Sequence, residues 1–221
     1  MTMSFALNRS YIGLRGDVVE VLLDSGIRPR TVLDVGCATG EMGRYLKEHF
    51  GATVHGVEPV AEMAGIAQTK LDYVFTGLAE DFVGQLDPQA TYDTIILADV
   101  LEHTIDPWTL LAFFRSRLAP GGIIVISMPN VRHWSTIFRL AILGDWPHRD
   151  RGIHDRTHLR FFTLRNMRDL VSGAGLMLLN VHRNLRIDEG FGRINAISSI
   201  TNIPGIRAFF VFQYILTCKA A

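Results

Sequence analysis

Cysteine, excess charge and long apolar runs are all scarce in this sequence, and each shortage excludes a class of protein. The two cysteines, Cys37 and Cys218, are too few for a disulfide framework, so a reducing, cytoplasmic location is expected. The 22 basic residues balance the 22 acidic ones, which gives no global attraction to nucleic acid. No apolar run reaches the length of about 18 residues that a transmembrane helix needs, and the N-terminus lacks the features of a signal peptide.

What the sequence does contain is enough apolar material for one well-buried domain. Hydrophobic residues make up 48% of its 221 positions, and this length suits a single α/β domain over 1–221. The excess of apolar residues lies in the second half, at 131–143 and 205–216. Core packing is the expected role of 131–143, with Trp134 and Trp146; a dimer face and a cover for a bulky ligand are the alternatives.

Short β-branched runs alternate with segments of helical period through residue 130, which predicts βαβ units and a parallel sheet. The strands are expected at 31–35, 53–57, 73–76, 94–98, 123–127, 177–181 and 209–218. Helices are expected at 17–23, 41–50 and 131–143, and from a cap at Thr163 to about residue 174. The stretch 186–206 is expected to be an insertion at the edge of the sheet.

The sharpest local signal is a glycine-bearing turn that joins the first strand to the next helix. Asp34 lies near the end of the strand, and Gly36 and Gly40 allow the backbone to approach a ligand closely. The glycines fall at 36, 40 and 43 and do not match the G-x-G-x-x-G spacing of a dinucleotide site. An acidic residue ahead of the turn suits an amine-bearing ligand better than a pyrophosphate.

This turn resembles motif I of the class I S-adenosylmethionine-dependent methyltransferases, D/E-x-G-x-G-x-G, with Cys37 and Ala38 at its variable and middle positions. The resemblance implies that Asp34, Gly36, Cys37, Ala38 and Gly40 contact the cofactor. It also implies that Glu58, followed by Pro59, binds the ribose hydroxyls. The alternative for Glu58 is to cap a helix that starts at Pro59.

Further segments follow in the order of that family. The run from Gly77 to Asp81 resembles its adenine-contacting stretch, which implies cofactor roles for Leu78, Ala79 and Glu80. The run from Ala98 to His103 resembles motif IV, which implies that Asp99 and Val100 lie beside the methionine part of the cofactor. Tyr11, together with Arg15, precedes the first helix, where related enzymes place a segment over the cofactor.

The resemblance covers residues 30–130 and implies a doubly wound, Rossmann-like α/β fold. We expect a seven-stranded, mostly parallel sheet whose last strand is antiparallel, with helices on both faces and a lid-like insertion. Within the single domain, 1–30 would form an N-terminal helical segment or lid and 31–130 the cofactor-binding core. Residues 131–162 would form an insertion on the acceptor side, and 163–221 a C-terminal helix and strands.

Methyl transfer to a hydroxyl needs a group that takes the proton, and histidine suits that task. Asp99, Glu102 and His103 form one candidate cluster. In ubiquinone-pathway O-methyltransferases, a similar acid-x-x-Glu-His stretch holds a divalent metal, but here a role for His103 facing the acceptor is preferred over a metal. His154 and His158, within a run of arginines and aspartates, form the second cluster. Their surroundings lack the cysteines and the H-E-x-x-H frame of a zinc site. The alternative is a solvated loop.

The sequence therefore predicts an S-adenosylmethionine-dependent O-methyltransferase that acts on a small molecule, with His154, His158 or His103 as the general base. A sugar or polysaccharide precursor is the first acceptor class, because the run from Asp155 to Thr163 resembles methyltransferases of such pathways. A quinone or other phenol is the alternative. Two further alternatives for the function are a non-catalytic cofactor-binding module and a nicotinamide dehydrogenase. The glycine spacing disfavours the dehydrogenase. Nucleic acid is not an expected partner, and a homodimer stays open.

Overall fold

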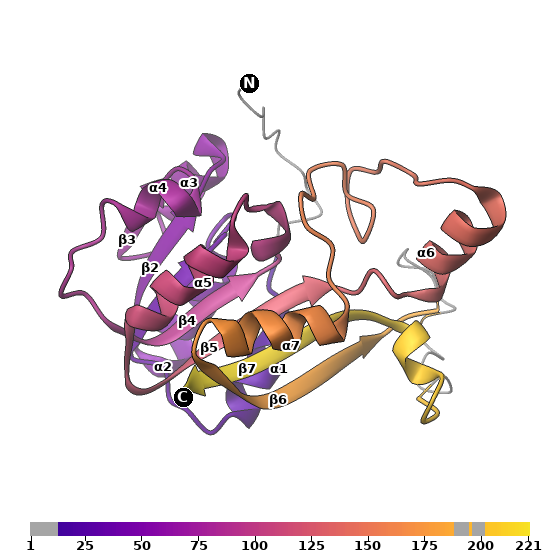
Figure 1. Ribbon diagram of the computed structural model, residues 1–221. Helices are drawn as coiled ribbons and strands as arrows, with labels where there is room; N and C mark the ends of the chain where they lie inside the picture. Colours follow the sequence, from indigo (N-terminus) through magenta and orange to yellow (C-terminus); the bar gives the residue numbers. More distant parts are fainter. Residues whose placement is uncertain (1–12, 188–194, 196–201) are drawn as a thin grey trace.

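The computed structural model describes residues 13–187, 195 and 202–221 and contains one seven-stranded sheet with helices on both sides (Figure 1). Tyr11 and most of the expected insertion at 186–206 lie outside the described residues. The strands are β1 (Thr31–Val35), β2 (Thr53–Glu58), β3 (Tyr73–Thr76), β4 (Tyr92–Ala98), β5 (Leu118–Pro129), β6 (Leu176–Leu185) and β7 (Val211–Ala220).

The sheet has the strand order β3-β2-β1-β4-β5-β7-β6. The first five strands pair in parallel, whereas β7 runs antiparallel to both β5 and β6. Central strands of a parallel sheet are covered on both faces, which is why β1 and β4 are buried along most of their length. The predicted fold, mostly parallel with an antiparallel last strand, is confirmed.

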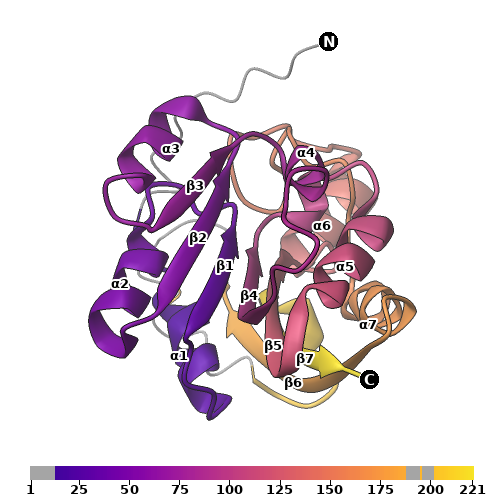
Figure 2. The same ribbon diagram turned by 90° about the vertical axis from the view of Figure 1, so that its left-hand side faces the viewer.

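Two groups of helices cover the two faces of the sheet (Figure 2). One face packs against α1 (Gly16–Asp24), α2 (Glu41–Phe50) and α3 (Ala61–Ala67). The other packs against α4 (Ala79–Val83), α5 (Pro107–Ser116) and α7 (Leu164–Gly173). Thr163 caps α7 as predicted, because its side chain accepts from the amide of Asn166 in a capping box. Each face therefore has its own apolar core.

The segment 131–143 differs from its prediction in both shape and packing. It forms a short helix, α6 (Trp134–Phe138), and then a π-helical turn, η3 (Arg139–Leu143), which ends at the left-handed Gly144. Its apolar side chains lie on the surface, so the prediction of a core helix is wrong. Across the described residues, no helix combines the length and apolar character needed to cross a membrane.

Candidate active site

The carboxyl ends of β1, β2 and β4 meet at one edge of the sheet, where the order of connections reverses between β1 and β4. In open α/β sheets this switch point leaves a crevice, because neighbouring crossovers leave toward opposite faces. The turns after these three strands carry most of the predicted cofactor residues. Long-range contacts bring His158, from the second candidate cluster, to the same edge.

The turn after β1 has a backbone that a ligand can approach closely. Gly36 and Gly40 have φ angles of 74° and 77°, and Ala38, at 48°, also lies in the left-handed region. A Cβ atom at Gly36 would lie 2.8 Å from Cγ2 of Val100, so the turns after β1 and β4 are in contact. Glycine is therefore required at position 36 for two reasons, its backbone conformation and the space available.

Glu58, at the end of β2, fixes the conformation of that turn. One carboxylate oxygen accepts from the amide of Ala38 and the other from the amide of Val60, each at 2.9 Å. Val60 is the N-cap residue of α3, which begins at Ala61 and has no side-chain cap, so the alternative of Glu58 capping a helix that starts at Pro59 is wrong. Pro59, between them, is half-buried. Burial raises the pKa of Glu58, and the two backbone amides oppose that rise.

Asp34 is a buried carboxyl with an unused acceptor. Its Oδ2 atom has no hydrogen-bond partner among the described residues, and only 3% of the residue is exposed. Burial, and then the proximity of Glu58, raises the pKa of Asp34 to about 7. Burial also raises the pKa of the Cys37 thiol, which packs against Gly56 and contributes an apolar wall. A cationic group arriving here would favour the ionised form of Asp34.

The turn after β3 is more open. Leu78 precedes α4 and is 43% exposed, whereas Ala79, the first residue of that helix, is buried. Glu80 accepts from the amide of Ile105 at 3.4 Å. Leu78 thus offers an exposed apolar surface at the carboxyl end of β3.

Asp99, directly after β4, is held from several elements. Its φ angle of 58° is rare for a residue other than glycine. Arg15 pairs with one of its carboxylate oxygens, and the side-chain amide of Gln213 donates to the other. Arg15 also binds Asp17, 2.9 Å away, and the Ser127 hydroxyl at 3.2 Å. The role of Gln213 was not predicted, because it comes from β7, far away in the sequence.

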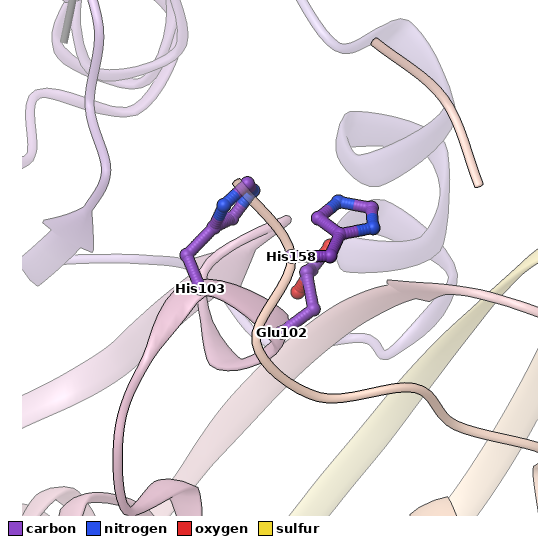
Figure 3. A group of neighbouring side chains, drawn as sticks. All are labelled: Glu102, His103 and His158. Atoms are coloured by element: carbon purple, nitrogen blue, oxygen red, sulfur yellow. The ribbon is translucent and has the colours of Figure 1, made fainter. Parts of the chain in front are cut away.

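Glu102, His103 and His158 form a compact group beside this point (Figure 3). One ligand atom from each lies within 4.8 Å of the others. Glu102 and His103 belong to the 3-10 turn η2 (Leu101–His103) after β4. His158 is brought in because the amides of Leu159 and Arg160 donate to the Glu102 carbonyl oxygen, at 2.8 and 3.0 Å.

Backbone carbonyls fix the tautomers of the two imidazoles. Nδ1 of His158 lies 3.2 Å from the carbonyl oxygen of Ile153, which can only accept, so Nδ1 carries the proton. Nδ1 of His103 lies 3.3 Å from the carbonyl oxygen of Thr157 and 3.0 Å from the hydroxyl of the same residue, which itself donates to Asp155 at 2.6 Å. His103 therefore donates from Nδ1 as well. In both rings Nε2 is left with its lone pair.

Burial also sets the charge of this group. It raises the pKa of Glu102 well above its usual value, and the nearby Asp99 adds to the rise. It lowers the pKa of His103, and it lowers the pKa of His158 to about 4, with His103 as the next cause. Burial therefore favours the protonated form of the Glu102 carboxyl and the neutral form of both imidazoles.

His154 does not belong to this group. It has no exposed surface, and its ring packs edge-on against Trp146, with centroids 5.0 Å apart. Trp146 in turn contacts the ring of Phe161 at the same distance. Burial among these aromatic rings gives His154 a packing role, and it is not proposed as a general base.

Comparisons with known proteins agree with this geometry. A family model described as a methyltransferase domain matches residues 8–181. A methyltransferase from Archaeoglobus fulgidus, described as dependent on S-adenosylmethionine, has the same fold, with a TM-score of 0.63, 21% identity and 96% of each chain covered. The chain therefore belongs to the methyltransferase-domain family and has the Rossmann-like fold of its S-adenosylmethionine-dependent members.

Curated relatives include ubiquinone biosynthesis O-methyltransferases. The protein of Bradyrhizobium diazoefficiens is 36% identical over 117 residues, which are 51% of this chain and 44% of that protein. A Rhodopseudomonas palustris protein is 32% identical over 164 residues, 70% of this chain and 60% of the relative. The chain thus spans about half the length of the curated relatives it matches.

Proposed function

We propose that this protein transfers the methyl group of S-adenosylmethionine to a hydroxyl of a small phenol or catechol related to quinone precursors. The observation that carries the proposal is the group formed by Glu102, His103 and His158 next to the cofactor turns. It offers two imidazole nitrogens with free lone pairs beside a buried carboxyl. A group of this kind suits an acceptor whose proton must be removed during transfer.

In this mechanism the turns after β1, β2 and β4 would hold the cofactor: Asp34 at the ammonium of its methionine part, Glu58 at its ribose, and Asp99 and Val100 near its sulfonium. Leu78, after β3, would cover the adenine. The bound cofactor would supply an activated methyl group. The acceptor oxygen would bond to the methyl carbon as the carbon–sulfur bond breaks, and the electron pair would leave with the sulfur of S-adenosylhomocysteine. Since the leaving group is good, positioning supplies much of the rate.

His103 is the general base in this proposal. Its Nδ1 donates to the Thr157 hydroxyl, which donates to Asp155, so a carboxylate supports the ring through one hydroxyl. Nε2 is left to take the proton from the acceptor as the oxygen–carbon bond forms. The ring of His158 lies edge-on to the ring of His103, with centroids 4.7 Å apart, and helps to orient the acceptor hydroxyl. Its pKa of about 4 makes it the weaker base.

A second candidate arrangement is a divalent cation held by Glu102, His103 and His158. Both carboxylate oxygens of Glu102 are buried and have no hydrogen-bond partner among the described residues. A neutral imidazole and a carboxylate are ordinary ligands for such ions, so the residues fit the group. A bound cation would lower the pKa of the acceptor hydroxyl. In that case Asp34 and Glu58 would keep the same roles toward the cofactor.

The acceptor class rests on two arguments. The relatives named ubiquinone biosynthesis O-methyltransferases favour a phenol over the sugar that the sequence placed first. Apolar and aromatic side chains next to the histidines, such as Phe161, whose ring lies 6.3 Å from that of His158, also suit a flat aromatic ring.

The test is a matched pair of acceptors with the same alkyl chain. With labelled S-adenosylmethionine, 4-octylcatechol should be methylated and octyl glucoside should not. Methylation of the glucoside alone would restore the sugar as the acceptor class. If neither is methylated while S-adenosylhomocysteine binds, the non-catalytic module would be the better account.

A further inference from the structure

The segment 131–162 leaves the fold and returns to it at one point. Asn130 and Phe162 form a parallel bridge, and the amide of Val131 donates to the Phe162 carbonyl oxygen at 3.0 Å. Near the returning end, His158 reaches the active site. Near the leaving end, α6 and η3 project outside the layers of the fold (Figure 1). One segment therefore connects the acceptor side of the site to a projecting element.

That projecting element exposes its apolar side chains and buries a polar one. Its one buried side chain is the polar Thr136. A surface helix of a globular protein normally packs its apolar stripe on the core and exposes its polar side. Here the large apolar side chains are exposed instead, and we call them the apolar tip: Trp134 (37%), Ile137 (40%), Phe138 (46%), Leu140 (57%), Ile142 (69%) and Leu143 (57%).

The charges of the same segment have one predominant sign. Residues 131–160 contain six arginines and three aspartates, although the whole chain is neutral. Two of the aspartates, Asp145 and Asp150, pair with arginines of the segment, and Asp155 is buried. Arg132 and Arg151 are exposed. An apolar surface with an excess of arginine is complementary to a surface that is apolar beneath and anionic above.

We propose that the apolar tip docks this protein on an anionic lipid surface. The ten residues Trp134–Leu143 are half of the about 20 that a spanning helix needs, so the tip would lie in the interface and not cross the bilayer. Docking would hold the mouth of the site near the lipid, where an apolar phenol accumulates. This last step rests on the proposed function, whereas the docking itself does not.

Flotation with vesicles tests the docking. Vesicles of phosphatidylglycerol and phosphatidylcholine (one to three) are compared with pure phosphatidylcholine, using the full chain. The variant carries Ile142→Glu and Leu143→Glu. The matched control carries Leu23→Glu and Leu179→Glu, two exposed leucines, 46% and 48%, on α1 and β6. Wild type and control should float with the anionic vesicles. The fraction of the tip variant that floats should be about tenfold lower. Pure phosphatidylcholine should bind the wild type several-fold less.

Three results would overturn the proposal. These are no binding of the wild type, flotation of the tip variant equal to that of the control, or a dimer that the tip variant turns into a monomer in sedimentation while no form binds vesicles. Methylation of water-soluble 4-methylcatechol should be equal in all three proteins, which also checks their folding. A milder variant without added charge, Ile142→Ser with Leu143→Ser, should show an intermediate loss of vesicle binding. If 4-methylcatechol is not methylated at all, the proposed function fails and the flotation result still decides the docking.

Discussion

The turns after β1 and β2 and the segment 131–162 meet at the same edge of the sheet, but they are built in different ways. The first region is local: Gly36, Ala38 and Glu58 are held by backbone amides within about twenty positions. The second depends on long-range contacts, because His158 reaches Glu102 through amides 57 and 58 positions further along the chain. The comparison indicates that cofactor binding and acceptor activation can be disrupted separately.

The largest expected effect is on transfer. His103→Ala should lower turnover of 4-octylcatechol about 10² to 10⁴-fold, because the proton acceptor is lost. His148→Ala, on an exposed histidine of the segment 131–162, is the matched control and should leave turnover unchanged. Steady-state kinetics at saturating cofactor measures both. Equal losses in the two variants would mean that the effect is not specific to His103 and would contradict its role as the base.

The next effect is on the cofactor turn. Gly36→Ala places a methyl group 2.8 Å from Cγ2 of Val100 at a φ of 74°, so calorimetry should show about 100-fold weaker binding of S-adenosylhomocysteine, about 3 kcal/mol. Gly51→Ala is the control, with a φ of 67° and open space around the new atom. It should lose some stability from the left-handed backbone and no affinity. Similar affinity losses would show that backbone strain alone matters.

A smaller effect should come from pH. The pKa of Asp34 is raised to about 7, so this carboxyl is protonated below pH 7 and ionised above it. If the ionised form binds the ammonium of the cofactor, affinity for S-adenosylhomocysteine should be about tenfold weaker at pH 6 than at pH 8. The free protein shows the opposite trend: a raised carboxyl pKa means that stability falls as pH rises from about 4 to about 7. Asp34→Asn should flatten both curves.

The smallest expected effect separates the two arrangements of Glu102, His103 and His158. If the imidazoles act as proton acceptors, treatment with a chelator should change turnover by less than about twofold. A loss above tenfold that Mg²⁺ or Zn²⁺ restores would instead assign the three residues to a cation.

The difference between the local turns and the segment 131–162 also explains which parts of the fold the sequence predicts. The strand, turn and helix around Gly36 are specified by residues that are neighbours in the chain, and α2 and β1 have the predicted bounds. The helix α5 is absent from the predicted elements although it has a local signal, because Asp106 caps it directly before Pro107. The core role of 131–143 rests on its helical and largely apolar pattern, and such a pattern does not tell whether the apolar face of a helix is covered.

The acceptor side was predictable only as a list of residue types. His154 and His158 have similar surroundings in the sequence, yet one is buried against Trp146 and the other faces His103. The difference comes from contacts of the segment with η2, which no spacing rule contains. Arg15 and Gln213, which both bind the Asp99 carboxylate, likewise come from opposite ends of the chain.

The most direct test of two separable regions is the affinity of one double variant, His103→Ala with His158→Ala, for S-adenosylhomocysteine. The account predicts a dissociation constant within about threefold of the wild type, because Asp34, Glu58 and the turn at Gly36 are untouched, while methyl transfer to 4-octylcatechol is lost. A fall in affinity that parallels the loss of transfer would contradict it, since the histidines would then be part of the cofactor site itself.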